Sequence, residues 1–417
     1  MQPFTLISYQ HDIIQRLAES LPHGVECWLV GGALRDDLLG RQATDFDFAL
    51  DSDPTPIAKR FAFDWGGTYI DLDPGRRQSR VVMSLSGSRY VLDFAPLRAA
   101  TLYKDLELRD FTCNAMARSL RHPQTLIDPL GGQRDLLLGV LEPCSEHVLG
   151  HDPLRMIKGI RHCVELNLEP TQGYAEQCAR FRGRLQDVAS ERVKAELGRV
   201  YAHSQVSLGV QLLRRYRLLD DWLSCGEIQP EATPVNRFIA AEKHLEEIVG
   251  ARLERRLDEW WPMYALVRFY ASIRSGDDIG KLTNRFRFSR KAGLLFQQLE
   301  TLDGLSLLPE VAKSSRARAL WVDGLGYDPL AGLLYLTSLP RFARIDLRLH
   351  VSDWLAAQVN GRVPDLIGAK ALVREWGVVP GVGLGRGLKM IRHDEICGRI
   401  SSPFSLDEIV AEYFKKD

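Results

Sequence analysis

Short apolar runs separated by polar breaks dominate the first hundred residues of the chain. Residues 8–21 carry apolar side chains at helical spacing, which predicts an amphipathic helix. An apolar run at 28–30 leads into two glycines, a helical pattern over 33–39, and a second apolar run at 45–50. The pattern therefore predicts a strand, a glycine turn, a helix and a second strand, in that order.

Further apolar segments extend this arrangement. The sequence Asp53-Pro-Thr-Pro56 is a break, and a helix through Ala58 and Phe61 is expected after it. Three more strands are predicted at 68–70, 79–83 and 89–94. Together these segments predict a small mixed sheet covered by helices.

The second half of the chain has a different pattern. From about residue 205 the apolar positions follow a helical period, and strand signals are few. Candidate helices lie at 208–219, 236–249, 260–273 and 292–302, and Trp260 and Trp261 are expected to fill the core. The fold class predicted is α+β, with a sheet-bearing head followed by an all-α remainder.

Composition and charge narrow the class of protein. The chain has 417 residues, of which 45% are hydrophobic and 26% charged, so two to four subdomains are expected. Lys plus Arg and Asp plus Glu number 54 each, so any contact with nucleic acid has to come from local basic patches.

The cysteines and the apolar runs bear on location. Seven scattered cysteines without a CxxC pair favour reduced thiols over a disulfide framework or a cysteine zinc site. The first twenty residues have neither a basic start nor a long apolar block, and no run reaches the length of a membrane span. We expect a cytoplasmic enzyme without a membrane segment, and no protein partner is inferred.

The candidate chemistry lies in the stretch from 27 to 50. Asp45 and Asp47 alternate on a predicted strand, so their carboxylates project from one face. Paired carboxylates on a rigid edge suit Mg²⁺, which keeps open positions for substrate phosphates. Gly31 and Gly32 let the backbone approach an anion at the start of a helix. These features predict two-metal diphosphate chemistry, whereas the plainer interpretation is a turn beside solvated acids.

The same stretch carries a resemblance. The string LVGGALRDDLLG followed by DFD resembles the first motif of the class II tRNA nucleotidyltransferases and bacterial poly(A) polymerases, which belong to the polymerase-β-like nucleotidyltransferase superfamily. The resemblance implies a catalytic head at 1–140, a helical neck with a base-selecting template at 141–205, a helical body at 206–310 and a helical, RNA-binding tail at 311–417.

A second motif is recognisable in Leu106 to Ala117, LELRDFTCNAMA. The resemblance implies that Arg109 and Arg35 bind the nucleotide triphosphate, and that Asp110 holds the ribose side or positions Arg109. A guanidinium matches phosphate oxygens in a bidentate way, and Asn114 would buttress the site by hydrogen bonding. The family usually has a second arginine where this chain has Leu108. A surface arginine at a helix end is the alternative.

The base-selecting template corresponds to HDPLR, residues 151–155. The family pattern is EDxxR, and the resemblance implies that Asp152 and Arg155 read the incoming base. A carboxylate accepts from the exocyclic amine of cytosine or adenine, so CTP and ATP fit. We expect a helix that starts at this point. His151 replaces the family's Glu, and an i,i+3 ion pair between Asp152 and Arg155 is the structural alternative.

Other segments carry less chemistry. Residues 127–136 resemble the third motif and predict a hinge between head and neck, while residues 190–197 predict a bracing helix with Ser190 as its N-cap. Asp93 lies on the last head strand, and its participation in the metal site is left open. The segment 363–400 resembles the tail of bacterial members, and its glycines do not form a dinucleotide fingerprint.

One basic segment is a candidate for RNA binding. It interleaves Phe286 and Phe288 with four cations, Arg285, Arg287, Arg290 and Lys291. The cations would hold RNA phosphates if they form an exposed patch. A helix rim that packs through the two phenylalanines is equally compatible with the pattern.

The resemblance implies a template-independent enzyme that adds CCA to the 3′ end of tRNA from CTP and ATP, with Mg²⁺ as cofactor and diphosphate as the leaving group. The short segment at 94–108 resembles enzymes that add only CC, because many complete CCA-adding relatives have a longer flexible loop there. Poly(A) synthesis and an inactive RNA-binding relative are the remaining alternatives.

Overall fold

The computed structural model describes residues 8–223, 233–273, 278–303, 314–339, 342, 347–360, 372–374, 378, 380–396 and 414. Cys225, Cys397 and part of the predicted tail segment 363–400 lie outside this description. The chain divides into two compact units: Met1–Glu196 with Arg215–Leu218, and Leu197–Arg214 with Leu219–Asp417. The four domains expected from the sequence stay a prediction.

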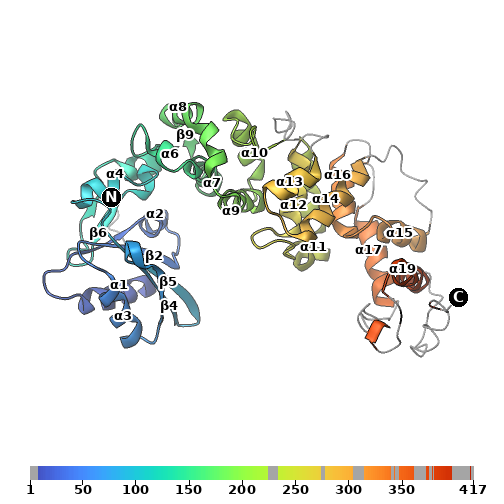
Figure 1. Ribbon diagram of the computed structural model, residues 1–417, viewed down its shortest axis with the longest axis horizontal. Coiled ribbons are helices and arrows are strands. Elements are labelled where there is room, and N and C mark those ends of the chain that lie inside the picture. Colours follow the sequence, from blue (N-terminus) through green and yellow to red (C-terminus); the bar gives the residue numbers. More distant parts are fainter. Residues whose placement is uncertain are drawn as a thin grey trace. The chain divides into compact units, whose positions relative to one another are not determined.

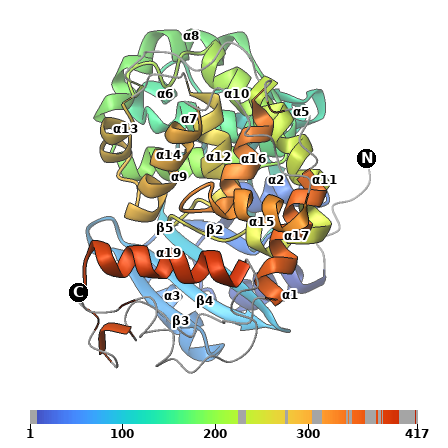
Figure 2. The ribbon, with the colours of Figure 1, turned by 90° about the vertical axis from the view of Figure 1, so that its right-hand side faces the viewer.

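The first unit is built on a mixed sheet of seven strands in the order β3-β4-β5-β2-β1-β6-β7 (Figures 1 and 2). The strands are β1 (Cys27–Val30), β2 (Asp45–Leu50), β3 (Thr68–Asp73), β4 (Gln78–Leu85), β5 (Ser88–Pro96), β6 (Ala117–Ser119) and β7 (Leu126–Ile127). β2 and β5 pair in parallel, and their neighbours pair antiparallel. The predicted mixed sheet is confirmed.

Helices flank this sheet. They are α1 (Ser8–Ser20), α2 (Gly32–Leu38), α3 (Thr55–Asp64), α4 (Leu102–Glu107) and α5 (Gly132–Leu138). α2 joins β1 to β2, and α3 packs on β3 and β4. The predicted sequence of strand, glycine turn, helix and strand is confirmed.

The two faces of β2 differ. Phe46 and Phe48 are buried, and the ring of Phe48 stacks on that of Phe94 with centroids 5.2 Å apart. Asp45 and Asp47 lie at the intervening positions and are exposed. Successive side chains on a strand point to opposite faces, so the two carboxylates share the face away from this aromatic core. This prediction is also confirmed.

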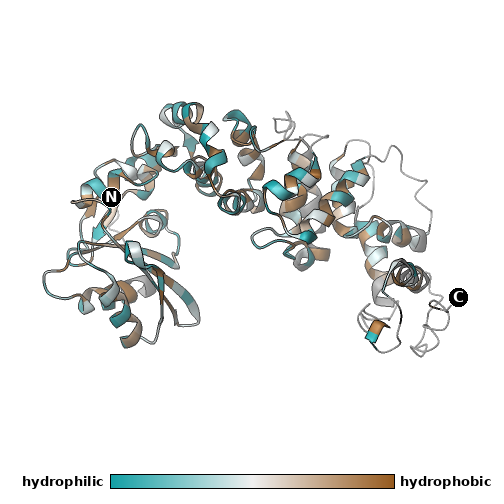
Figure 3. Ribbon diagram, viewed as in Figure 1, coloured by the Kyte–Doolittle hydropathy of each residue, from teal (hydrophilic) through white to brown (hydrophobic). Residues whose placement is uncertain are grey.

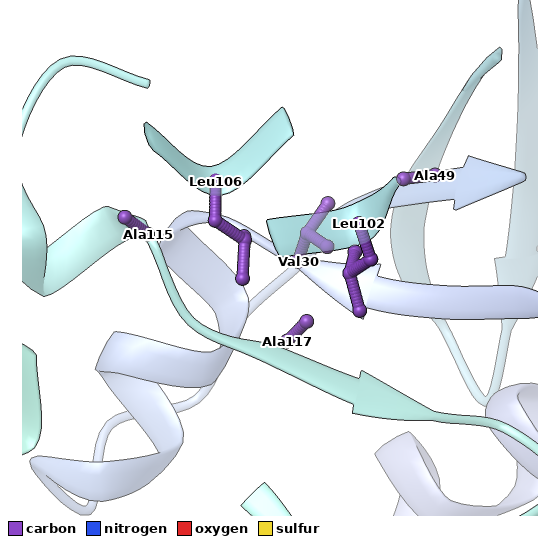
Figure 4. Packing of buried hydrophobic residues seen from close by; sticks show 6 residues of the cluster. All are labelled: Val30, Ala49, Leu102, Leu106, Ala115 and Ala117. Carbon is purple, nitrogen blue, oxygen red and sulfur yellow. The ribbon is translucent and has the colours of Figure 1, made fainter. Parts of the chain in front are cut away.

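The short helix α4 is fixed to the same face as the carboxylates. Leu102 and Leu106 point from α4 into a cluster with Val30 of β1 and Ala49 of β2 (Figure 4). Val30 pairs with Asp47 in the sheet, which places it on the carboxylate face. The segment that leads to Arg109 is therefore anchored in the core.

Helices follow the sheet in this unit: α6 (Val148–His151), α7 (Leu154–Leu166), α8 (Gln172–Phe181) and α9 (Ser190–Ala202), the last of which crosses into the second unit. Leu154, Ile157, Ile160 and Val164 are buried, as the apolar stripe predicts. Two boundaries differ. His151 ends α6, so α7 begins only after Pro153, and Ser190 is the first residue of α9 instead of a cap outside it.

The second unit is helical. Its principal helices are α10 (Val206–Arg215), α11 (Thr233–Leu253), α12 (Met263–Ser272), α13 (Ile279–Arg285), α14 (Arg290–Asp303), α15 (Ser315–Asp323), α16 (Pro329–Ser338), α17 (Leu347–Asn360) and α19 (Val382–Ile396). These helices carry both hydrophobic and hydrophilic segments in Figure 3, as amphipathic helices do. The four predicted helices are confirmed as α10, α11, α12 and α14, and the other helices of this unit were not individually predicted.

Aromatic rings fill the core of this second unit. Trp261, Phe269, Phe286 and Phe296 are all fully buried. The expectation that both tryptophans fill the core is wrong for Trp260, which is 46% exposed. Trp261 instead packs edge-to-face on Phe269 at 5.5 Å. Consecutive residues of an irregular segment point in different directions, so only one indole reaches the core. Within the described residues no helix is long and apolar enough to cross a membrane.

Candidate active site

A cavity of about 570 Å³ opens on the carboxylate face of the sheet in the first unit. Its walls come from the ends of β1, β2 and β5, from α4, and from α7 and α9. Residues more than a hundred positions apart, such as Gly31 and Arg192, therefore line one space. Asp47 belongs to this lining, and Asp45 lies two residues before it on the same face.

The glycine turn brings the backbone directly against one carboxylate. Gly31 has a φ of 77°, and a Cβ atom placed there would lie 2.8 Å from Asp47 Oδ2 and 3.6 Å from Arg109 Nη1. Gly32 leaves room for Arg35, since a Cβ atom placed on Gly32 would lie 3.4 Å from an Arg35 guanidinium nitrogen. Both glycines thus stand where backbone and functional side chains meet at the cavity.

Asp47 continues a polar row across the sheet. It pairs in register with Asp93 of β5, and Asp93 pairs with Arg80 of β4. Arg80 forms two hydrogen bonds of 2.7 Å to the Asp93 carboxylate. Asp93 therefore faces the cavity beside Asp47, but an arginine on the neighbouring strand already engages it.

The environment of Asp47 disfavours its charged form. The carboxylate touches solvent inside a concave site that is surrounded by protein, and this burial raises the pKa of Asp47 above its ordinary value. Nearby Arg109 opposes the shift, and Asp93 adds to it. A carboxylate held this way gains from a bound cation that replaces the lost hydration.

The side chain of Arg109 is oriented by hydrogen bonds to Asp105 of α4. Its Nε and Nη2 donate to Asp105 Oδ2 at 3.2 and 3.1 Å, and Asp105 Oδ1 accepts from the backbone N–H of Arg98 at 2.9 Å. Asp105 is almost fully buried. Asp110, which was expected either to hold the ribose side or to position Arg109, pairs with Lys158 of α7 at 2.5 Å; its role on the ribose side stays a prediction.

Asn114 connects several of these groups. Its side-chain oxygen accepts from Arg35 Nη1 at 2.8 Å, and its amide nitrogen lies 3.2 Å from both Asp110 Oδ1 and His162 Nε2. The pKa of Asp110 lies well below its usual range: burial would raise it, but the Lys158 charge and the hydrogen bonds from Lys158 and Asn114 outweigh burial. Asn114 thus supports the site, as expected, by contacting the side chains of Arg35, Asp110 and His162.

The expected template residues do not pair with each other. Asp152 forms an ion pair with Arg192 of α9 at 2.9 Å, and its other oxygen accepts from the Leu154 N–H. Arg155 donates to the carbonyl oxygens of Val148 and Leu108 at 3.2 and 3.1 Å. The i,i+3 pair considered as the alternative is therefore replaced by contacts to other elements, and both side chains line the cavity.

Comparisons with known proteins agree with this arrangement. Residues 27–142 match the family model of the poly A polymerase head domain. A CC-adding tRNA nucleotidyltransferase of Geobacter sulfurreducens is 37% identical over 42% of this chain and 40% of its own length. One of Thermus thermophilus, also CC-adding, is 29% identical over 89% of this chain and 90% of its own. The solved structure of a CCA-adding enzyme in its apo form superposes with a TM-score of 0.72, at 18% identity, over 98% of this chain and 94% of that one.

The chain is therefore similar to tRNA nucleotidyltransferases, with a poly A polymerase head domain over residues 27–142. Its matches to the first three relatives span 40 to 46% of their lengths, which is less than half of each. The match to the poly A polymerase head domain spans the mixed sheet, and the helical remainder follows the fold of the CCA-adding structure.

Nucleotidyltransferases of this family generally use a divalent metal ion. Among the described residues no group of three or more His, Cys, Asp or Glu side chains forms a ready metal site. Asp45 and Asp47 nonetheless fit such an ion, because in the described part of the chain neither side-chain carboxylate accepts a hydrogen bond or forms an ion pair. Mg²⁺ is commonly held by one or two carboxylates together with water and substrate phosphates.

The basic segment of the second unit has features of both interpretations: two packed phenylalanines and an exposed set of cations. Phe286 and Phe288 are buried in the aromatic core, whereas the four cations are exposed. The guanidinium of Arg285 lies over the Trp222 ring at 5.3 Å. The buried rings thus fix a short stretch whose cations face solvent.

Several cavity residues were not singled out from the sequence. They are Arg98, Asp105, Lys158 and Arg161; His162 was noted only for sharing a helix face with Asp152 and Arg155, and Arg192 and Glu196 only as parts of a bracing helix. Helical spacing was a usable signal for two of them. Asp105 lies four residues before Arg109, and Lys158 lies three residues after Arg155.

Proposed function

We propose that this chain is a tRNA nucleotidyltransferase that joins nucleotides from CTP and ATP to the 3′ end of tRNA and releases diphosphate. The observation that carries the proposal is the pair of unengaged carboxylates, Asp45 and Asp47, on one face of β2 against the Gly31 turn. The guanidinium groups of Arg35 and Arg109, which line the same cavity, suit a triphosphate.

The residues divide the work between phosphate and metal. Arg35, Arg109 and the N–H groups of the glycine turn would hold the triphosphate, with Asp105 fixing the direction of Arg109. Asp45 and Asp47 would hold Mg²⁺, which supplies activation of the attacking hydroxyl and charge neutralisation of the diphosphate. Asp110 and Asn114 would keep the floor of the site in place.

Asp152 and Arg155 would read the base. Arg192 donates to Asp152 Oδ2, so a cytosine or adenine amine would approach a carboxylate that is already oriented. Arg155 is held by two backbone carbonyls, which leaves its remaining N–H groups to face ring acceptors. UTP and GTP would place a keto oxygen against the carboxylate and bind more weakly.

Full CCA addition and CC addition are both carried forward. One observation favours CC addition: the segment before Arg109 is short and its helix α4 is anchored through Leu102 and Leu106. A pocket wall fixed in this way suits a single base better than a change from C to A. The CC-adding names of the Geobacter sulfurreducens and Thermus thermophilus relatives point the same way.

Incubation of the protein with labelled CTP or ATP separately tests this choice. The acceptors are tRNA transcripts that end before CCA or after CC. CTP incorporation into the first with no ATP incorporation into the second indicates CC addition, whereas incorporation of both indicates CCA addition. Long products with ATP alone would indicate poly(A) synthesis. No product with either nucleotide would contradict the proposal and favour an inactive RNA-binding relative.

The carboxylate assignment has its own test. Asp45→Asn and Asp47→Asn should each abolish Mg²⁺-dependent incorporation while tRNA binding persists. Asp71→Asn is the matched control, because Asp71 is an exposed acid of β3 in the same sheet, at a position that points away from the row of Asp47. Unchanged incorporation by the Asp45 and Asp47 variants would refute the metal assignment.

The remaining assignments belong to the same proposal. The head at 1–140 would carry the chemistry, the neck at 141–205 the template, and the body and tail at 206–310 and 311–417 the tRNA. The exposed cations Arg285, Arg287, Arg290 and Lys291 would contact RNA phosphates. A cytoplasmic location follows from such a substrate.

A further inference from the structure

We propose that His162 is a positioning residue for nucleotide binding: as a neutral imidazole it fixes the orientation of the Asn114 amide, and Asn114 in turn holds Arg35 and Asp110 at the wall of the cavity. The inference rests on the proposed function, since it assigns a role in the same site. His162 lies on α7 and lines the cavity; helical spacing puts it on the face expected for Asp152 and Arg155, but no role was predicted for it from the sequence.

The hydrogen-bond geometry leaves one arrangement of the amide. Arginine can only donate, so the Asn114 atom that lies 2.8 Å from Arg35 Nη1 has to be the oxygen. The amide nitrogen then faces the other two partners, Asp110 Oδ1 and His162 Nε2, both at 3.2 Å. A carboxylate accepts one N–H, so the second N–H is directed at the imidazole.

This assignment fixes the state of His162. Its Nε2 has to accept, and therefore carries no proton, so the ring is neutral with the proton on Nδ1. Nδ1 finds no hydrogen-bond acceptor among the described residues; the nearest carboxylate oxygen, Glu165 Oε2, lies 3.9 Å away. The edge of the ring packs against Phe111 at a centroid distance of 5.8 Å.

The charges around the ring agree with the neutral state. Burial and the adjacent Arg161 lower the pKa of His162 well below its ordinary value, and Arg35 and Lys158 act in the same direction. Asp110 opposes them. Because the pKa lies below the ordinary value, the ring stays neutral throughout the neutral pH range.

Loss of the imidazole acceptor would leave one N–H of the buried Asn114 amide without a hydrogen-bond acceptor. Arg35 and Asp110 still favour the present orientation of the amide, but a buried unpaired N–H is costly. We therefore expect Asn114 to shift, and Arg35, which it holds, to lose its fixed place beside Gly32. The effect should fall on nucleotide binding, because Arg35 and Asn114 line the cavity and neither holds the metal.

The test compares two variants of His162. His162→Phe keeps a flat ring but has no acceptor, and the KM for CTP is expected to rise about tenfold with kcat changed much less. His162→Gln offers a carbonyl oxygen that accepts but is never protonated, and should restore a KM near that of the wild type. His350→Phe is the control for loss of a buried histidine, since His350 lies on α17 in the second unit.

A spectroscopic readout is independent of activity. In a two-bond ¹⁵N–¹H correlation spectrum, the imidazole signal that is lost in His162→Phe identifies His162. In the wild-type protein this signal should have the pattern of the Nδ1–H tautomer and should not change between pH 6 and 8. An Nε2–H tautomer, or an ordinary titration, would overturn the inference. So would an unchanged KM for CTP in folded His162→Phe, or equal losses in His162→Phe and His162→Gln. Absence of incorporation by the wild type would instead refute the proposed function, while the tautomer measurement would still decide the state of His162.

Discussion

Gly31 and Asp47 occupy adjoining space that admits no additional atom. A Cβ on Gly31 would lie 2.8 Å from Asp47 Oδ2, closer than such atoms approach in proteins, and the backbone at Gly31 has a positive φ of 77°. Glycine is therefore required at this position for two reasons: the backbone has a positive φ, and the Asp47 carboxylate leaves no room for a Cβ atom. The relation joins the turn proposed to bind the nucleotide to the acid proposed to hold the metal.

Gly31→Ala is expected to reduce CTP incorporation on the order of 100-fold, because Asp47 has to move from its position. The cost to stability should be about 1–3 kcal/mol from the strained backbone. Gly40→Ala is the matched control: Gly40 also has a positive φ, 68°, but nothing lies within 4 Å of its Cβ position. CTP turnover and urea unfolding are measured for both variants. Equal activity of Gly31→Ala and Gly40→Ala would show that the close approach of Gly31 to Asp47 is not required.

Asp105→Asn should weaken nucleotide binding through Arg109. The amide cannot accept both Arg109 donors and the Arg98 N–H as the carboxylate does, so a rise in the KM for CTP of about tenfold and a stability loss of about 2 kcal/mol are expected. Glu107→Gln on the same helix removes only an exposed pair with Lys104 and should cost less than about 0.5 kcal/mol. A KM that stays at the wild-type value in Asp105→Asn would show that Arg109 does not depend on Asp105.

Lys158→Met should destabilise the protein in a pH-dependent way. The pKa of Asp110 is depressed in the folded state, so its ion pair stabilises the protein above the ordinary carboxyl pKa of about 4, and this contribution is lost as the pH falls toward the depressed value. We expect a loss of about 1–2 kcal/mol at pH 7, reduced because the Lys158 side chain is 37% exposed.

Urea unfolding at pH 7, 5 and 4 measures the difference between Lys158→Met and the wild type. The difference should narrow toward pH 4 and below, where the unpaired carboxyl of the variant is protonated. The double variant Lys158→Met with Asp110→Asn provides the control and should show little of this pH dependence. A difference that is constant with pH would mean that packing of the lysine stem, and not the ion pair, is responsible.

Replacement of Arg285, Arg287, Arg290 and Lys291 by Gln should weaken tRNA binding without unfolding the second unit, since these side chains are exposed. The slope of log Kd against log salt should fall by about 0.7–0.9 for each phosphate contact removed. Arg60→Gln is the control, because Arg60 is an exposed cation on α3 of the first unit. An unchanged slope would mean that the patch does not contact RNA.

The sequence was sufficient for features with a local cause. Alternation placed Asp45 and Asp47 on one face and Phe46 and Phe48 on the other, because a strand turns each successive side chain to the opposite side. Helical spacing likewise located the buried stripe of α7. Boundaries were less exact: α7 begins after Pro153, because Asp152 remains extended between two helices.

Partners across the fold were beyond the reach of the sequence. Asp152 was expected to share a face with Arg155, yet it pairs with Arg192, forty residues later. Asp110 was expected beside Arg109, yet the charge it meets is Lys158. Trp260 and Trp261 were indistinguishable by composition, and only the path of the chain decides that Trp261 is the buried one.

The sequence alone determined the elements, the family resemblance and the face on which the acids lie, because these depend on residue order and on the periods of strand and helix. Only the tertiary structure decided which charges meet, that α4 anchors the wall beside Arg109, and that a buried His162 faces Asn114. Such contacts join residues from separate elements, and their existence depends on packing distances that no local pattern encodes.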